Sequence, residues 1–356
     1  MQNIKFRIAK DEFIGRGSFG EVYKAYDIND KSQIYAAKLI PSELMNDPNK
    51  LNNFSNEILI GGQFTNKNLV KLKGLENDEN NNTYMILEYC NGGDLFSFTQ
   101  KFNNKYKRNL HEKEIQKILK DILYGLSCLH RNNIIHYDIK PTNILLNYEK
   151  EEDKNNLNIF ECTFKIADFG LAKYSDLTKK YKMSDSIGGT VQYMPPEFLL
   201  KGDIKASLSE YYDSKIINDK VDIWALGILS YKLKFWNHPF IPVFDINSYI
   251  KELKDNIREG YYKIIIEENK TISKELLSFI DSCLKEEQDL RKSSEDLEYS
   301  RFITRDTEKF HFVDIENINE EIPKDYIDGD LNLMQKEIRM NIYKNNYIEE
   351  EFGEKM

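Results

Sequence analysis

The stretch IIHYDIKPTNILLN, residues 134–147, is the most informative part of this 356-residue chain. It places Asp138, Lys140 and Asn143 between apolar runs, which predicts a loop that joins a helix to a pair of strands. An aspartate, a lysine two residues later and an asparagine five residues later can supply a proton acceptor, a cation for a phosphate group and a metal ligand. The pattern therefore indicates one polar loop with three chemically complementary groups.

A second polar position follows about twenty residues later. In KIADFGLAK, residues 165–173, Asp168 immediately precedes a Phe-Gly turn. Asn143 and Asp168 are then two oxygen ligands on separate loops. Such a pair suits Mg2+, which takes few protein ligands and keeps phosphate and water oxygens for the rest. The sequence therefore predicts a magnesium site at these two residues.

The stretch GRGSFGEV, residues 15–22, has three glycines at the G-x-G-x-x-G spacing. In a dinucleotide-binding fold the last glycine opens a helix, whereas here Val22 to Tyr26 continue as a strand and AAK (36–38) follows in the next strand. A strand, glycine turn and strand let backbone N–H groups approach phosphates without obstruction by Cβ atoms. This stretch alone leaves an ordinary glycine hairpin equally open.

Six motifs in order resolve that ambiguity. They are the glycine-rich stretch, AAK, HYDIKPTN (136–143), DFG (168–170), GTVQYMPPE (189–197) and DIWALG (222–227). With this set, residues 8–303 resemble a eukaryotic protein kinase of the serine/threonine type. The resemblance implies an α+β, bilobal fold with a small β-rich N-lobe and one main helix, and a larger helical C-lobe. The expected parts are an N-lobe at about 8–88, a hinge at 88–92, a C-lobe at about 93–303 and an acidic extension at 304–356.

The resemblance also implies a role for each matching residue. Asp138 is expected to orient the substrate hydroxyl and Lys140 to stabilise the γ-phosphate. Lys38 is expected to hold the ATP phosphates and to pair with Glu57, with Glu43 as the weaker alternative. Mg2+ is expected at Asn143 and Asp168. The predicted ATP-binding residues are Gly15, Gly17, Gly20, Val22, Ala36, Lys38, Leu87, Glu88, Tyr89, Cys90, Asp94 and Leu145, and those of the substrate loop and its anchor are Thr190, Glu197 and Arg291.

Two positions depart from the family pattern. Tyr137 replaces the arginine that usually precedes the catalytic aspartate and captures a phosphate on the activation loop. Gly61, one turn after Glu57, replaces a bulky apolar residue. We hypothesise that a regulatory partner or the C-terminal extension completes the packing there. These departures keep a pseudokinase, a binding module on the same fold, as the alternative function, whereas the peptide-binding motif at 189–197 disfavours a small-molecule kinase.

Composition limits the partners. The chain has 50 basic and 59 acidic residues, a net charge of −9, which argues against wholesale binding of nucleic acid or of an anionic membrane surface. Residues 304–356 contain 14 acidic and 7 basic residues and so carry most of that charge. No apolar run approaches the ~20 residues of a membrane span, and the four cysteines are scattered. We expect a cytoplasmic protein, with nuclear access left open, whose partners are ATP and a protein substrate.

Overall fold

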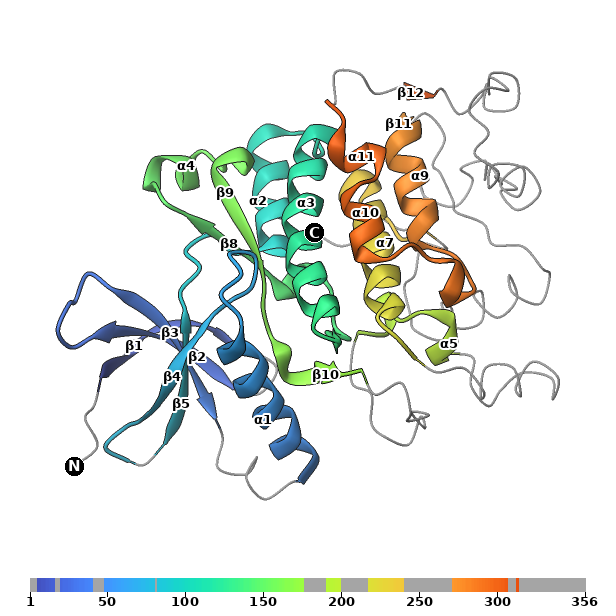
Figure 1. Ribbon diagram of the computed structural model, residues 1–356. Helices are drawn as coiled ribbons and strands as arrows, with labels where there is room; N and C mark the ends of the chain where they lie inside the picture. Colours follow the sequence, from blue (N-terminus) through green and yellow to red (C-terminus); the bar gives the residue numbers. More distant parts are fainter. Residues whose placement is uncertain are drawn as a thin grey trace, which may run out of the picture.

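The computed structural model describes most of the chain between Lys5 and Val313. The described ranges are 5–16, 20–40, 48–80, 82–175, 190–199, 217–239, 271–306 and 312–313. Figure 1 shows two lobes, with a twisted sheet and one helix in the first and a cluster of helices in the second. The predicted α+β, bilobal architecture is therefore confirmed.

The N-lobe is a five-stranded antiparallel sheet with one helix against it. The strand order is β1-β2-β3-β5-β4. β-Branched and aromatic residues favour these strands, and the central strand β3 pairs with both β2 and β5. In this register Lys38 lies opposite Val22 on one side and Met85 on the other. The elements are β1 (Phe6–Arg16), β2 (Glu21–Asp27), β3 (Ile34–Ile40), α1 (Pro48–Gln63), β4 (Leu72–Asn77) and β5 (Thr83–Glu88).

The C-lobe is mainly helical. Its described helices are α2 (Leu95–Tyr106), α3 (Glu112–Arg131), α4 (Glu151–Asn155), α5 (Pro196–Leu199), α7 (Lys220–Phe235), α9 (Lys274–Cys283), α10 (Ser294–Glu298) and α11 (Arg301–Thr304). Its short strands are β6 (Gly93–Asp94), β7 (Ile134–Ile135), β8 (Ile144–Tyr148), β9 (Cys162–Ile166), β10 (Lys173–Tyr174), β11 (Ile272–Ser273) and β12 (Phe312–Val313). β8 pairs antiparallel with β9, so the loops before and after this pair meet at one end.

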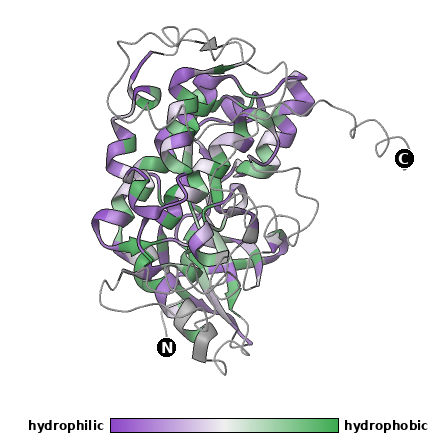
Figure 2. Cartoon of the chain, turned by 90° about the vertical axis from the view of Figure 1, so that its right-hand side faces the viewer, coloured by the Kyte–Doolittle hydropathy of each residue, from purple (hydrophilic) through white to green (hydrophobic). Residues whose placement is uncertain are grey.

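The helical core follows from two sequence patterns. In α3 the apolar residues recur every three or four positions, and this face is completely buried, whereas the face toward solvent is polar. α7 is apolar on nearly all sides and lies in the interior, where a helix without a polar face is stable. Figure 2 shows apolar and hydrophilic residues alternating along the helices of this lobe. None of the helices that the structure describes combines the length and apolar character needed to cross a bilayer.

The described part of the C-terminal extension lies against the C-lobe. β12 pairs antiparallel with β11, with Val313 opposite Ile272 and Phe312 opposite Ser273. Figure 1 shows this pair at the end of the C-lobe away from α1. The hypothesis that the extension reaches Gly61 concerns residues 314–356, which lie outside the described residues.

Candidate active site

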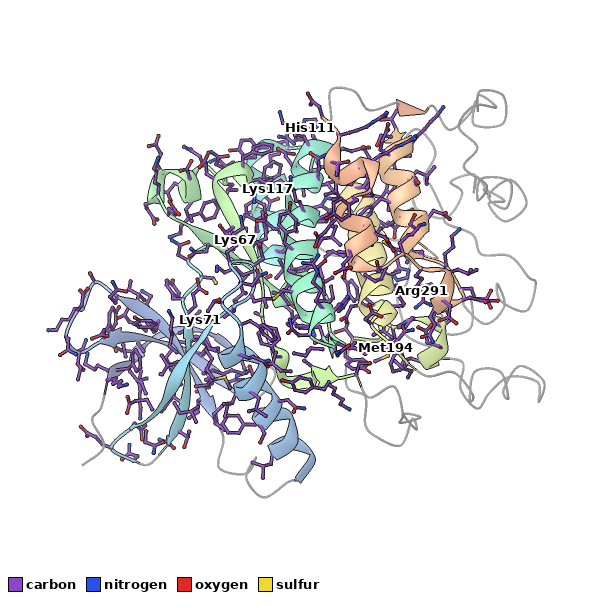
Figure 3. All side chains as sticks on the ribbon, in the orientation of Figure 1. Lys67, Lys71, His111, Lys117, Met194 and Arg291 are labelled. Atoms are coloured by element: carbon purple, nitrogen blue, oxygen red, sulfur yellow. The ribbon has the colours of Figure 1, made fainter. Side chains whose placement is uncertain are left out.

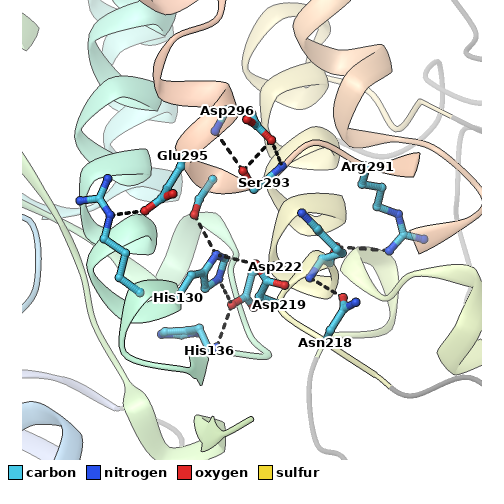
Figure 4. A network of polar contacts seen from close by, with 12 residues as sticks. His130, His136, Asn218, Asp219, Asp222, Arg291, Ser293, Glu295 and Asp296 are labelled. Atoms are coloured by element: carbon cyan, nitrogen blue, oxygen red, sulfur yellow. Dashed lines mark hydrogen bonds and ion pairs between the residues drawn. The ribbon is translucent and has the colours of Figure 1, made fainter. Parts of the chain in front are cut away.

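A buried aspartate of α7 fixes the backbone of the loop that carries Asp138. Asp222 Oδ2 accepts a hydrogen bond from the His136 amide at 2.8 Å, and Asp222 Oδ1 accepts one from the Tyr137 amide at 2.9 Å. His130 Nε2 is 2.9 Å from the same carboxylate, and Figure 4 shows this network. Tyr137 has a φ of +65°, a conformation that costs a residue with a Cβ about 1–3 kcal/mol. Asp222 therefore holds this strained loop in place.

Asp138 is at the centre of a compact polar cluster. Lys140 Nζ lies 2.6 Å from Asp138 Oδ2, and Asn143 Nδ2 donates to the same oxygen at 2.9 Å. The Thr190 amide donates to Asp138 Oδ1 at 3.2 Å, and Lys140 Nζ donates to Thr190 Oγ1 at 2.9 Å. Asp138 is only 8% exposed. The structure therefore brings the predicted catalytic residues of the loop together with Thr190 of the substrate segment, in an arrangement that fixes the carboxylate.

A second charged cluster joins the N-lobe to the segment that contains Asp168. Lys38 Nζ on β3 lies 2.7 Å from Glu57 Oε1 on α1 and 3.5 Å from Asp168 Oδ1. Burial alone would lower the pKa of Lys38, but the carboxylates of Glu57 and Asp168 outweigh burial, so that this pKa is raised. Lys38 is therefore a buried ammonium with the expected glutamate as its partner. Glu43, the alternative, lies outside the described residues.

The two predicted magnesium ligands lie on loops that are joined by their backbones. Ala167 N, next to Asp168, donates to the carbonyl of Asn143 at 2.8 Å. The amide nitrogen of Asn143 is committed to Asp138, so its oxygen Oδ1 is the atom left to face a cation. Two hard oxygen ligands fit Mg2+, whereas no group of three or more His, Cys, Asp or Glu suited to a metal occurs among the described residues. The donor set therefore fits magnesium better than zinc.

The predicted ATP-binding residues surround the junction of the two lobes. Gly15 pairs with Val22 across the β1–β2 hairpin, and Gly20 precedes β2, whereas Gly17 lies outside the described residues. Ala36 on β3 pairs with Leu87 on β5. The side chains of Leu87 and Leu145 pack, partly buried, against a small apolar cluster of Val70, Cys90 and Ala167. Nearly all of the predicted apolar lining is thus contributed by adjacent strands and the hinge.

Two of the predicted nucleotide-binding residues, Glu88 and Asp94, already make contacts within the protein. The Glu88 amide donates to the Lys71 carbonyl at 2.9 Å, and the Glu88 carboxylate pairs with Lys165 at 3.0 Å. Hydrogen bonds to adenine would therefore come from backbone groups of the hinge other than the Glu88 amide. Burial raises the pKa of Cys90 to about 12, so this side chain is a neutral thiol. Asp94 caps α2 by accepting from the Ser97 amide at 2.9 Å, so the predicted ribose contact would share that carboxylate.

A buried ion pair holds the motif at 189–197, the predicted substrate segment, against the C-lobe. Arg291 donates through Nη1 and Nη2 to the two carboxylate oxygens of Glu197 on α5, at 2.6 and 2.7 Å. Both residues are almost completely buried. Figure 3 shows Arg291 and Met194 close to α5. This bidentate geometry fixes the end of the motif at 189–197 against the C-lobe.

The two departures from the family pattern are accommodated by packing. The ring of Tyr137 meets that of Phe198 edge to face, 6.1 Å away, within an apolar cluster. At Gly61 an added Cβ would lie 3.4 Å from Leu72 Cβ and 3.8 Å from Phe169, so these side chains already close over the glycine. The Lys38–Glu57 pair is formed despite the missing side chain. The missing arginine at residue 137 also predicts that activity does not depend strongly on phosphorylation within 171–189, of which 176–189 lie outside the described residues.

Sequence reasoning missed four residues near the site: Asp222, Tyr193, Lys232 and His238. The sequence could have indicated Asp222, because a lone carboxylate inside the apolar run VDIWALG must be buried and therefore requires hydrogen-bond donors. A small pocket beside Asp138 is lined by Thr190, Tyr193 and Met194, among others. No local pattern marks Tyr193 as a wall of that pocket. The tertiary fold alone brings Tyr193 to the pocket beside Asp138.

Comparisons with known proteins agree with this geometry. The protein kinase domain family matches residues 8–303. The chain is 31% identical over 302 residues to serine/threonine-protein kinase KIC1 of Saccharomyces cerevisiae, across 83% of this chain and 23% of that protein. It is 31% identical over 260 residues to Aurora kinase of Encephalitozoon cuniculi, across 73% and 78%. It is also 31% identical over 250 residues to serine/threonine-protein kinase ULK3 of Mus musculus, across 70% and 45%.

The chain thus spans less than a quarter of KIC1 and less than half of ULK3, but most of the Aurora kinase. The family match covers both lobes and every motif discussed above. The chain therefore belongs to the protein kinase domain family.

Proposed function

We propose that the chain is a serine/threonine protein kinase that transfers the γ-phosphoryl group of ATP to protein hydroxyls. The observation that carries the proposal is the cluster of Asp138, Lys140, Asn143 and Thr190, which forms one continuous set of polar contacts. Asp138 would orient the incoming hydroxyl and accept its proton, and Lys140 would stabilise the transferring phosphate. Because the transition state is loose, alignment and charge stabilisation are the main requirements.

The N-lobe would position the nucleotide in the same mechanism. Lys38, held by Glu57, would bind the phosphates, while the strands and the hinge would enclose the purine. Asn143 and Asp168 would hold Mg2+, which neutralises phosphate charge when bound. Membership of the protein kinase family implies ATP as the phosphate donor and, in general, magnesium. The named ligands are our assignment, supported by their oxygen donors.

Substitution of Asp138 by Asn tests the proposal. The amide keeps the shape of the side chain but cannot accept the proton, so turnover on a generic protein substrate should fall about 10²- to 10⁴-fold. Binding of ATP, measured by titration calorimetry in the presence of Mg2+, should change little, because Asp138 acts on the acceptor. Equal turnover in the two proteins would contradict the assignment.

The pseudokinase alternative has no support in the geometry. Such a binding module would tolerate loss of one or more charged groups, whereas here Lys38, Glu57, Asp138, Asn143 and Asp168 all lie in the described structure with close polar contacts. Tyr137 and Gly61 are accommodated by neighbouring side chains. We further propose a cytoplasmic location and a protein partner as substrate. Fluorescence microscopy of the tagged chain would test the location.

A further inference from the structure

A lysine of the central helix lies behind the substrate segment. Lys232 on α7 places its Nζ 5.1 Å from the centre of the Tyr193 ring. Tyr193 belongs to the motif at 189–197 and is 8% exposed. Close by, His238 Nε2 donates to the carbonyl of Gln192 at 3.0 Å. The ammonium of Lys232 therefore lies beside the ring of Tyr193, in the same motif as Thr190.

The positive charge of Lys232 has no carboxylate partner among the described residues. Lys234, two positions further along the same helix, pairs with Glu112 at 2.9 Å. Burial lowers the pKa of Lys232, and none of the described acidic groups offsets this effect. A cation over an aromatic ring recovers only part of the hydration that burial removes. Among the described residues, the positive charge of Lys232 is therefore only partly compensated, by the ring of Tyr193.

The neighbouring histidine does not supply a second charge. Burial lowers the pKa of His238 to about 4, and the nearby charge of Lys232 adds to this effect. At neutral pH His238 is therefore an uncharged imidazole that donates to a backbone carbonyl. Among Gln192, Tyr193, Lys232 and His238, Lys232 carries the only formal charge, so an incoming anion would meet a single ammonium.

The position of Tyr193 connects Lys232 to the reacting centre. Tyr193, Asp138 and Thr190 line the same pocket. Burial, and then the charge of Asp138, raise the pKa of the Tyr193 hydroxyl. A peptide that presents its hydroxyl to Asp138 would pass over Tyr193 and within reach of the lysine beside it.

We propose that Lys232 recognises an anionic group of the protein substrate, a carboxylate or a phosphate close in sequence to the phosphorylated residue. The inference rests on the proposed kinase function. Lys232 is partly exposed, so an anion can reach it, and partial burial keeps salt from screening the interaction fully. Lys232 is thus a specificity-determining residue that favours acidic substrates.

Matched peptides test the proposal on the full chain. Each peptide contains one serine and one variable residue near it. The variable residue is Glu, Gln or phosphothreonine, and its position differs from one set of peptides to the next. The wild type should prefer Glu or phosphothreonine over Gln at one or two positions by about tenfold in kcat/KM, which corresponds to about 1.4 kcal/mol. The Glu and phosphothreonine peptides distinguish a carboxylate from a phosphate as the preferred group.

Three variants connect the preference to this lysine. K232R should keep the preference and K232M should abolish it. The control is K113M, which removes another lysine that lies over an aromatic ring, 5.8 Å from Phe160 on the C-lobe surface, and should leave the preference unchanged. Thermal unfolding of each variant checks that the chain is folded.

The possible results separate this inference from the kinase function. Turnover of the neutral Gln peptides measures the proposed function, whereas the Glu-to-Gln ratio measures the role of Lys232. A wild type that phosphorylates all peptides equally would overturn the inference and leave the function intact, as would a preference that survives in folded K232M. A wild type that phosphorylates no peptide would overturn both. If K232M fails to fold, the wild-type ratio and K232R still decide the outcome.

Discussion

The carboxylate of Asp138 receives contacts from Lys140, Asn143 and Thr190, which lie on two different segments. Each contact restricts rotation of the carboxylate, so the group is oriented before a substrate arrives. Preorganisation of this kind lowers the barrier without any rearrangement at the moment of reaction. Contacts between individual side chains therefore fix the orientation of the carboxylate that we propose to be catalytic.

His238 allows a prediction on pH and stability at the same scale. Its folded pKa of about 4 lies below the ordinary 6.5, because burial disfavours the imidazolium. The unfolded chain therefore binds a proton more readily than the folded chain between these values. The stability contributed by His238 is fully present above about pH 6.5 and is lost as the pH falls towards 4.

Urea unfolding at about pH 7 and about pH 5 measures this contribution. The wild type should lose about 2 kcal/mol more free energy of unfolding between these pH values than H238Q, whose amide does not titrate but can still donate to Gln192. Equal pH dependence in the two proteins would show that His238 is not buried in its neutral form.

At the scale of elements, helix α1 connects the Lys38–Glu57 ion pair to the packing of the N-lobe. It carries Glu57, the partner of Lys38, and one turn later Gly61, which faces Leu72 and Phe169. Glycine inside a helix costs backbone entropy, so the turn that positions Glu57 is intrinsically weak. Packing of Leu72 and Phe169 over Gly61 compensates for the missing side chain.

The substitution G61A tests this balance. An added Cβ would lie in ordinary van der Waals contact with Leu72, so the variant should gain about 0.5–1 kcal/mol in the free energy of unfolding from its better helix propensity. G125A in α3 is the contrast, because there a Cβ would lie only 2.9 Å from the Asn68 carbonyl oxygen and should cost about 1–3 kcal/mol. Thermal and urea unfolding measure both, and a destabilised G61A would contradict the packing described here.

Over the whole molecule, the Glu197–Arg291 pair joins segments 94 residues apart. Arg291 also donates through Nε to the Lys285 carbonyl at 2.7 Å, so its guanidinium links the substrate segment to the end of the C-lobe. A buried pair of this kind is expensive to break on one side only, because the remaining charge loses its partner without regaining water.

A double-mutant cycle tests this connection. E197Q and R291M should each cost about 3–5 kcal/mol in the free energy of unfolding, whereas the double variant should cost less than the sum. Turnover at a temperature where all variants are folded should fall as well, because the substrate segment loses its anchor. Additive costs would mean that the two side chains are not coupled.

The periodic pattern of apolar residues determined helix α3, and uniformly apolar runs determined α7 and several strands, because each pattern records which faces of an element are buried. The order of the motifs determined the family and indicated Asp138, Asn143 and Asp168. The tertiary structure decided which groups meet. It brings Asp222 to two amides more than 80 residues away, sets Lys38 opposite Val22, and leaves Lys232 beside Tyr193 without a carboxylate among the described residues. The physical reason is that local pattern encodes burial, whereas the pairing of buried charges depends on the path of the whole chain.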